Sequence, residues 1–309
     1  MALAKEDLTK CMRKQSEFMR ILKKIEKFFS SIKHEYYFNY LYYSSNGSEL
    51  VKLYNQRVKE GYFPNNPIGE KSPIWVCWWQ GEENLPDICK ACLNTIKLHA
   101  CRHPVILIDK NNVGNYVEFP KILQHKIDEG KIDFTHQSDI LRCLLLKKHG
   151  GIWIDITIFL TKDVDLFIPT HKSFWTCRHK QLINNICNGW WSCNFFATGK
   201  EHIIPSFILD LFINHFKKHD DFKVYLWLDY AFTIGRRKIN IINQIAKNQQ
   251  YSKILGLKRQ LNNPYNEKEW EYFVNEFNFQ KLSYKVCLKK EPPDGRETVY
   301  GHFFKLYGK

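Results

Sequence analysis

The stretch HQSDILRCLLLKKHGG, residues 136–151, continues into IWIDITIFL at 152–160, and the two halves together decide the fold. The first half has the apolar spacing of a buried helix, which we expect over 138–149. Ser138 can cap this helix, and Asp139 suits its positive end. Arg142, three residues further on, should lie on the same face as Asp139.

The second half of this stretch has the pattern of a buried strand, expected over 151–160. Gly150 and Gly151 can end the helix and permit a tight turn into it. Isoleucine occupies every second position from 152 to 158, so the residues between should share the other face: Trp153, Asp155, Thr157 and Phe159. A carboxylate inside an apolar strand is costly without a partner, so Asp155 needs a cation, a donor or a ligand hydroxyl.

The flanking sequence repeats this alternation of strand and helix. The run IWVCWWQG at 74–81 predicts a buried strand followed by a loop. An α/β fold with a mostly parallel sheet flanked by helices follows, with ligands at the carboxyl ends of the strands. The other expected elements are strands near 104–109 and 193–198, helices near 86–100, 119–129, 202–218 and 224–248, and an irregular tail after 260.

The N-terminal region reads as basic amphipathic helices over 1–60. Apolar residues recur there every three or four positions, with lysines between them: Phe18, Met19, Ile21, Leu22, Ile25, Phe28 and Phe29. Such helices either pack on the catalytic core or contact a membrane surface. The segment PNNPIGEKSP at 64–73 breaks the pattern, which predicts a helical accessory region at 1–68 and a catalytic domain at 69–309.

Composition narrows the class of protein without choosing a function. The net charge of +14 favours anionic partners such as nucleotide diphosphates, lipid-linked diphosphates or headgroups. No nucleic-acid motif stands out, so nucleic acid is not an expected partner. No apolar run reaches membrane-spanning length and no signal peptide is visible, so we expect a cytoplasmic protein, with peripheral contact at the inner membrane surface as an alternative. The CxxC at Cys89 and Cys92 fits core packing better than metal or redox chemistry.

The spacing of SDILR, about ten residues, and GGIWID resembles the DXD-motif sugar transferases of glycosyltransferase family 32 and the related capsular polysaccharide synthesis proteins. The similarity extends to IWVCWWQGEENLPDICKAC at 74–92 and to WLDYAF at 227–232, and it covers roughly 70–270. It implies a GT-A type fold. The implied activity is retaining transfer of a hexose from a nucleoside diphosphate sugar, UDP first, to a glycan or lipid-linked oligosaccharide acceptor.

The resemblance also implies roles for particular residues. Asp139 and Arg142 would contact the donor sugar and its phosphate, while Asp155 would bind ribose, a sugar hydroxyl or a metal. A charged acceptor beside a charged donor suits sugar hydroxyls, and cations stabilise a leaving diphosphate. The wider set of donor-binding candidates is Trp78, Trp79, Gln80, Ser138, Thr157 and Lys305.

The sequence departs from DXD where Thr157 replaces the second carboxylate. Hard divalent cations prefer carboxylate and phosphate oxygens. We still expect Mn²⁺ or Mg²⁺, held by Asp155 with a tail residue such as His302; alternatively, lysine and arginine neutralise the diphosphate. A literal D-x-D follows at Asp163 and Asp165, which we interpret as an exposed loop.

Other candidates depend on less evidence. Asp229 and Asn194 are the catalytic candidates, and His302 and Lys305 resemble a tail that folds over the diphosphate. His136 is expected to be structural. Two other functions stay open: a toxin-like glycosyltransferase acting on a protein, and a non-catalytic carbohydrate-binding protein.

Overall fold

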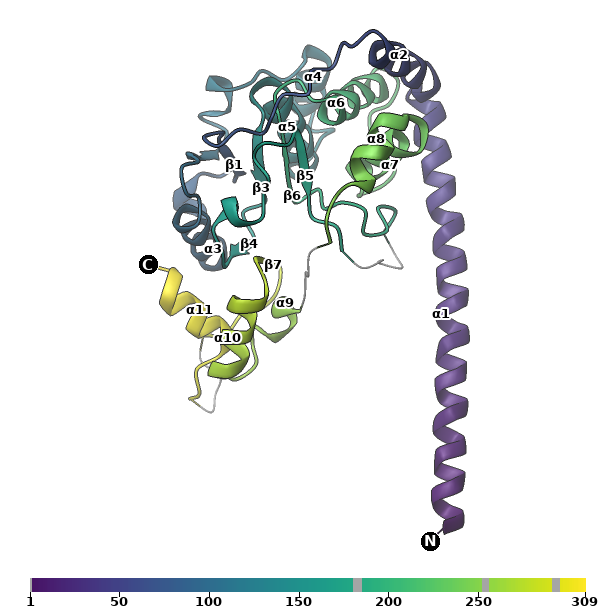
Figure 1. Ribbon diagram of the computed structural model, residues 1–309, viewed down its shortest axis with the longest axis vertical. Helices are drawn as coiled ribbons and strands as arrows, with labels where there is room; N and C mark the ends of the chain where they lie inside the picture. Colours follow the sequence, from purple (N-terminus) through teal and green to yellow (C-terminus); the bar gives the residue numbers. More distant parts are fainter. Residues whose placement is uncertain (1, 180–184, 252–255, 291–294) are drawn as a thin grey trace.

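The computed structural model describes residues 2–179, 185–251, 256–290 and 295–309, except for the side chains of 2–18, 20 and 23, which include Phe18. The chain forms an α/β body from which a long N-terminal helix extends (Figure 1). Its elements are α1 (Ala2–Ser44), α2 (Gly47–Lys59), β1 (Ile74–Cys77), α3 (Asp87–Leu98), β2 (Val105–Ile108), α4 (Lys121–Asp128), α5 (Phe134–His149), β3 (Gly151–Ile154), β4 (Ile158–Leu160), β5 (Phe174–Thr176), β6 (Phe195–Thr198), α6 (Ile203–Phe216), α7 (Trp227–Lys238), α8 (Asn240–Lys247), α9 (Leu257–Gln260), α10 (Glu267–Glu276), β7 (Phe279–Lys281) and α11 (Val299–Tyr307).

The central sheet has the strand order β2-β1-β3-β6-β5. Strand β1 runs parallel to both β2 and β3, whereas β6 runs antiparallel to its neighbours β3 and β5. Four strands therefore share one direction, and the predicted mostly parallel sheet is confirmed. The antiparallel β6 brings the segment before it, which ends at Asn194, to the carboxyl end of β3.

Two apolar clusters cover the two faces of this sheet. On one face Trp75 and Trp153 pack with helices α5, α6 and α7. On the other, Ile74 and Ile152 pack with α3, α10, α11 and the β4–β7 pair. Adjacent strand residues thus point to opposite faces, as the period of a strand requires. The predicted α/β class with flanking helices is confirmed, and Cys89 and Cys92 both lie in the second cluster as core residues.

The single strand predicted over 151–160 is wrong. Strand β3 stops at Ile154, the chain turns so that Ile158 N donates to the carbonyl of Asp155 at 2.9 Å, and β4 belongs to a second sheet with β7. The isoleucines on both sides of the turn fill the same apolar cluster, and Phe159 joins them there. Because burial continues through the turn, the periodic pattern hides it.

Two helix boundaries also differ from the prediction. Helix α5 begins four residues early, with Asp133 as the cap that accepts from the His136 amide, so Ser138 lies in the second turn instead. The helix predicted over 224–248 is two helices, α7 and α8, because Ile239 between them has extended backbone. Gly150 and Gly151 do form the predicted turn, with φ of 69° and 106°.

The described part of the tail after 260 has regular elements, so the prediction of an irregular tail is wrong. It contains α10, the short strand β7 and α11, and β7 pairs with β4 in antiparallel register. Helix α11 packs on α3. The strand has three residues, which is too short for an alternating pattern to be read from sequence. The end of β7 and the residues that follow it complete one side of the cavity described below.

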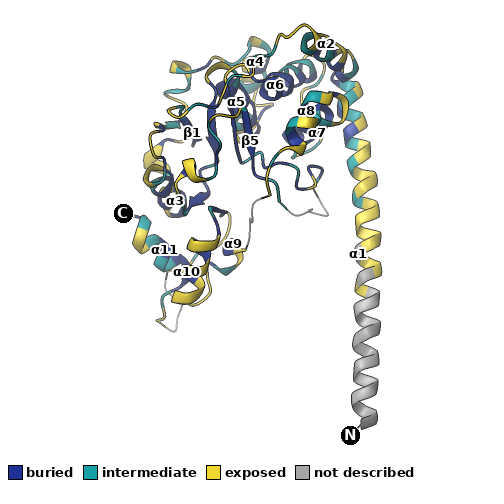
Figure 2. Ribbon diagram, viewed as in Figure 1, coloured by how far each residue is buried: buried dark blue, intermediate teal, exposed yellow. Residues whose placement is uncertain are grey.

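The N-terminal region is helical, as predicted. Helix α1 packs on α7, helix α2 packs on α6 and α7, and α1 extends from there to the N-terminus as one long helix (Figures 1 and 2). A division at 68–69 stays a prediction. Within the described part of the chain, none of the helices is both long and apolar enough to span a bilayer.

Candidate active site

A cavity of about 420 Å³ opens at the carboxyl ends of β1 and β3. This is the edge of the sheet at which α/β proteins bind ligands. Several chain segments contribute to it: the end of β1 and the loop after it, the first turns of α5, the end of β3 and the turn to β4, the segment before α7, helix α9, and the end of β7 with the residues after it. The residues that line it are Cys77, Trp78, Trp79, Gln80, Phe134, Thr135, Ser138, Arg142, Trp153, Asp155, Ile156, Thr157, Tyr225, Lys258, Lys281, Leu282, Ser283, Tyr284 and Lys285.

Asp155 accepts hydrogen bonds from both sides of the site. Its Oδ2 accepts from the Lys281 ammonium at 2.7 Å, and its Oδ1 accepts from Trp153 Nε1 at 2.9 Å. The same ammonium donates to Thr157 Oγ1 at 2.6 Å. The partner that an apolar strand carboxylate requires is therefore a lysine 126 residues later in the chain.

Arg142 joins the predicted donor residues into one charged group. Its Nη2 lies 2.8 Å from Asp139 Oδ1 and 3.7 Å from Asp155 Oδ1. Its guanidinium also donates to the Cys193 carbonyl and lies over the Trp153 ring, 4.8 Å from the centroid. Arg142 and Asp139 are 6% and 8% exposed, so their charges are held in a poorly hydrated environment where electrostatic interactions are strong.

Burial affects the pKa of the two carboxyls differently. It raises the pKa of Asp139, with the charges of Asp155 and Asp229 acting in the same direction and Arg142 opposing them. Burial also acts to raise the pKa of Asp155, but the charges of Lys281 and Arg142 outweigh it and the pKa is lowered. Asp155 is therefore the carboxylate that stays ionised.

The loop after β1 supplies the aromatic part of the cavity. Trp79 is buried and its Nε1 donates to Ser138 Oγ at 2.9 Å, so both residues serve partly as structure. Trp78 is more exposed and meets the ring of Tyr284 edge-on, with centroids 5.3 Å apart. Gln80 is exposed at the rim.

The two catalytic candidates, Asp229 and Asn194, are not among the described residues that line the cavity. Asp229 Oδ1 accepts from Trp191 Nε1 at 2.8 Å and from Cys193 Sγ at 3.3 Å, and burial raises its pKa. Asn194 accepts from the Asp155 amide through its backbone carbonyl, at 2.9 Å. Their catalytic roles stay predictions.

The tail candidates lie on α11 and do not line the described cavity. His302 stacks on Tyr265 with centroids 3.9 Å apart, and its Nδ1 is 3.3 Å from Glu297. Lys305 is mostly exposed, 3.8 Å from Glu297. The structure therefore does not bring His302 and Lys305 to the cavity with Asp155, and their roles at the diphosphate and the metal stay predictions.

The second D-x-D and His136 have structural partners. Asp163 and Asp165 lie 2.9 Å from His99 and His103 respectively, with both carboxylates partly or largely exposed. His136 is buried, stacks on Phe222 with centroids 3.9 Å apart, and pairs with Asp133. These contacts agree with the interpretation of a surface loop and a structural histidine.

Sequence reasoning missed the contribution of the C-terminal half to the cavity. Lys258, Lys281, Tyr284 and Lys285 line it together with Tyr225. Their positions depend on the pairing of β4 with β7, a contact between distant segments. The one local signal was the density of lysine and aromatic residues after 277, in NFQKLSYK.

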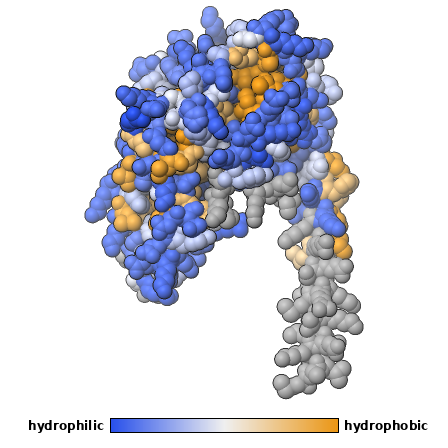
Figure 3. Space-filling view, viewed as in Figure 1, coloured by the Kyte–Doolittle hydropathy of each residue, from blue (hydrophilic) through white to orange (hydrophobic). Residues whose placement is uncertain are grey.

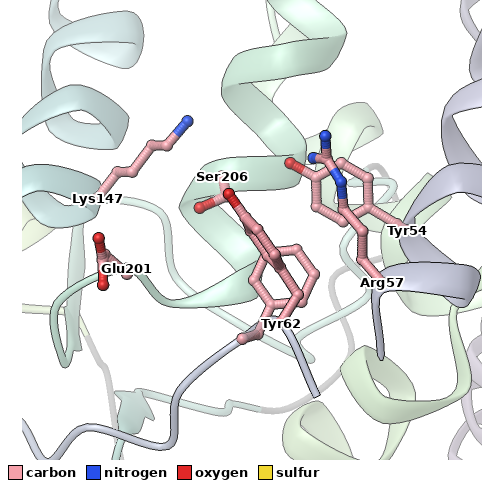
Figure 4. Close-up of a pocket in the computed structure, with 7 residues that line it drawn as sticks. Tyr54, Arg57, Tyr62, Lys147, Glu201 and Ser206 are labelled. Atoms are coloured by element: carbon pink, nitrogen blue, oxygen red, sulfur yellow. The ribbon is translucent and has the colours of Figure 1, made fainter. Parts of the chain in front are cut away.

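A second cavity, of about 270 Å³, lies between α2, α5 and α6, away from these residues (Figure 4). In its lining, the Arg57 guanidinium lies over the Tyr62 ring, 5.1 Å from the ring centroid. None of the residues predicted from the sequence lies in it. Its lining consists of Tyr54, Arg57, Tyr62, Phe63, Lys147, Glu201 and Ser206.

Known proteins that are similar to this chain include one relative and several solved structures, two of which follow. The O-glycosyltransferase braB of Annulohypoxylon truncatum is 28% identical over 109 residues, which are 32% of this chain and 26% of that protein, so the chain matches about a quarter of the relative's length. The PaToxG glycosyltransferase is 20% identical, with a TM-score of 0.44 over 72% of this chain and 84% of the other. The bifunctional glycosyltransferase WbbM is 10% identical, with a TM-score of 0.39 over 77% and 50%.

The family match covers far more of the chain. The model of the capsular polysaccharide synthesis protein family matches residues 20–303, which include the cavity, the charged group around Arg142 and most of α1. Both TM-scores lie below 0.5, so no property of those two enzymes is transferred here. On the family match, the chain belongs to the capsular polysaccharide synthesis proteins.

Proposed function

We propose that this protein is a retaining glycosyltransferase that moves a hexose from a nucleoside diphosphate sugar to a hydroxyl of a glycan acceptor. One observation carries the proposal: the Asp155 carboxylate is held between Lys281 and Arg142 in the lining of a cavity that also includes the partly exposed Trp78 and the exposed Tyr284. This arrangement puts fixed charges of both signs where a polar, anionic ligand can enter.

The chemistry of the lining matches the parts of such a donor. Sugar hydroxyls are bound well by ionised carboxylates beside charged donors, which Asp155 and Arg142 supply. A nucleobase can stack on the accessible rings of Trp78 and Tyr284. The diphosphate carries negative charge that Lys258, Lys281 and Lys285 can neutralise. UDP-hexoses are the first donors to test.

The expected divalent cation fits these residues poorly. Asp155 and Thr157 both hydrogen-bond to Lys281, an ammonium group where a D-x-D motif would present a second carboxylate to a metal. Among the side chains that the structure describes, no three of His, Cys, Asp or Glu are grouped so as to hold a metal ion. We therefore favour the alternative, in which Lys281 and Arg142 stabilise the leaving diphosphate directly.

Burial of the charged group explains how these residues could act. Arg142 is fixed by Asp139, the Cys193 carbonyl and the Trp153 ring, so it needs little reorganisation when charge develops on the leaving group. Asp155 holds the Lys281 ammonium at the turn between β3 and β4. In the retaining reaction the bond from the anomeric carbon to the diphosphate breaks, the acceptor oxygen forms its bond to that carbon on the same face, and the departing phosphate oxygen takes the proton of the acceptor hydroxyl.

The test is release of nucleotide from a panel of nucleoside diphosphate sugars, with Asp155→Asn as the decisive variant. Asp163→Asn is its matched control, because Asp163 belongs to the literal D-x-D but pairs with His99 on the surface. We expect turnover of at least one donor, a large loss in Asp155→Asn and near-normal rates in Asp163→Asn.

Two results would reject the proposal. If no donor is turned over while sugars still bind, the protein is a non-catalytic carbohydrate-binding protein. If transfer is found only to a protein acceptor, the glycan acceptor is wrong and the toxin-like alternative holds.

A further inference from the structure

Helix α1 has an apolar face that is open to solvent where the helix extends beyond the body (Figures 2 and 3). Its members, which we call the outward face, are all large and about half exposed or more. Phe28 and Phe29 are 62% and 65% exposed, values unusual for phenylalanine. The outward face consists of Ile21, Leu22, Ile25, Phe28, Phe29, Ile32 and Tyr36.

This face points away from the rest of the molecule. At about 100° per residue, its seven members fall within an arc of about 120° on the helix. The residues that fix α1 to the body lie on the opposite side of the helix: Phe38 and Leu41 are buried, and His34 Nδ1 lies 2.7 Å from Oη, the phenolic oxygen of Tyr230 on α7. Among the described residues, the contacts that fix α1 to the body therefore lie on the opposite side of the helix from the outward face.

The charge on α1 distinguishes between possible occupants. Between positions 13 and 33 the sequence has seven Lys or Arg residues and two Glu residues. Lys24 and Lys33 fall just beyond the two edges of the outward face, where they would meet lipid headgroups if the apolar residues entered a bilayer. A second copy of the helix would instead bring two basic stretches together, which is unfavourable.

The width of the face points in the same direction. A two-helix seam uses a narrow apolar stripe, whereas helices that lie in a membrane interface have a broad apolar face, basic flanks and aromatic residues. We propose that α1 binds the surface of an anionic lipid bilayer, with its axis along the membrane plane and the outward face in the headgroup region. This inference does not depend on the donor or the reaction proposed above.

The test uses the full-length protein and sedimentation with vesicles. One set is an equal mixture of phosphatidylglycerol and phosphatidylcholine, and the other is phosphatidylcholine alone. We expect binding to the anionic vesicles that weakens as salt rises, and little binding to the neutral ones. The double substitution Phe28→Gln and Phe29→Gln should weaken binding by at least about tenfold, because it removes two rings that would be buried in the bilayer.

The matched control is Leu98→Gln with Leu166→Gln, which removes two apolar side chains of comparable exposure elsewhere on the surface. It should bind vesicles like the parent, and circular dichroism should show equal helix content in all three proteins. The proposal is overturned if the parent does not bind anionic vesicles, if the Phe28 and Phe29 substitutions leave binding unchanged, or if they abolish a dimer seen by sedimentation equilibrium, which would make a second copy the occupant.

Discussion

The Lys281 ammonium lies 2.7 Å from Asp155 Oδ2 and 2.6 Å from Thr157 Oγ1, although 126 residues separate it from Asp155 in the chain. This contact joins the end of β7 to the turn after β3. The Lys281 ammonium therefore lies beside both motif positions, Asp155 and Thr157, and at the second of these the threonine replaces a carboxylate.

Replacing Lys281 with methionine should lower kcat by about 100-fold, the loss typical when a group that stabilises transition-state charge is removed. Nucleotide release at saturating donor measures it. Lys97→Met is the control, because Lys97 is also paired, with Glu82 at 2.8 Å, but on the exposed surface. Equal rates in the two variants would remove Lys281 from the mechanism.

Removing divalent cations should not abolish the activity. If Lys281 and Arg142 neutralise the diphosphate, treatment with EDTA should lower the rate by less than about tenfold. The double variant Thr157→Asp with Lys281→Ala restores the D-x-D carboxylates and removes the ammonium, so its activity should depend on added Mn²⁺. Complete loss in the EDTA-treated parent, reversed by Mn²⁺, would instead support the divalent cation predicted from the sequence.

Arg142→Lys should lower kcat/KM by at least about tenfold, because an ammonium cannot reproduce the contacts of a planar guanidinium with Asp139, the Cys193 carbonyl and the Trp153 ring. Arg57→Lys makes the same change in the second cavity and should leave the rate near that of the parent. Thermal melting of both variants separates loss of catalysis from loss of folding. A normal rate in Arg142→Lys would mean that only positive charge is needed there.

Stability should fall on acidification because of two buried histidines. Burial lowers the pKa of His202 to about 3 and that of His215 to about 4. Between about pH 6.5 and these values the unfolded chain binds more protons than the folded one, so the free energy of unfolding falls as pH falls, by up to about 1.4 kcal/mol per pH unit for each ring. Chemical denaturation at pH 7.5 and 5.5 measures the difference.

The matching variant is His202→Asn. His202 Nδ1 accepts from the Ile204 amide and caps α6, and asparagine can also act as a cap but does not titrate. We expect a smaller acid-induced loss in this variant, whereas His125→Asn, on the exposed side of α4, should retain the full loss. An unchanged loss in His202→Asn would show that protonation of His202 does not contribute.

Local sequence patterns predicted most of the central layer correctly. The helices α3, α4 and α6 and the strands β1, β2 and β6 have periods and boundaries that neighbouring residues determine, and all were found where expected. The charged group also followed from sequence, since helical spacing puts Asp139 and Arg142 on one face. These features share one property: they depend on residues that are close together in the sequence, or on which residues are buried.

The errors arose where distant contacts decide the structure. The isoleucines at 154, 156 and 158 stay in one apolar cluster through a change of direction, so hydrophobicity could not reveal the turn. Helix α5 begins four residues before Ser138, and the start of the helix was placed too late because the dense run of apolar residues begins only at Ile140. The role of Lys281 could not be predicted, because its position beside Asp155 depends on the pairing of β7 with β4, and each of these strands has three residues.

The division of the predicted strand into β3 and β4 has a consequence for synthesis of the protein. Strand β4 is buried and apolar, yet its strand partner β7 is translated more than 100 residues later. At ribosomal rates of about 5–20 residues per second, β4 waits roughly 6–25 s for that partner. During this interval the apolar strand β4 has an unpaired edge, which can bind chaperones or other unfolded chains. A chain that ends before residue 279 would thus have both an incomplete cavity and an aggregation-prone strand.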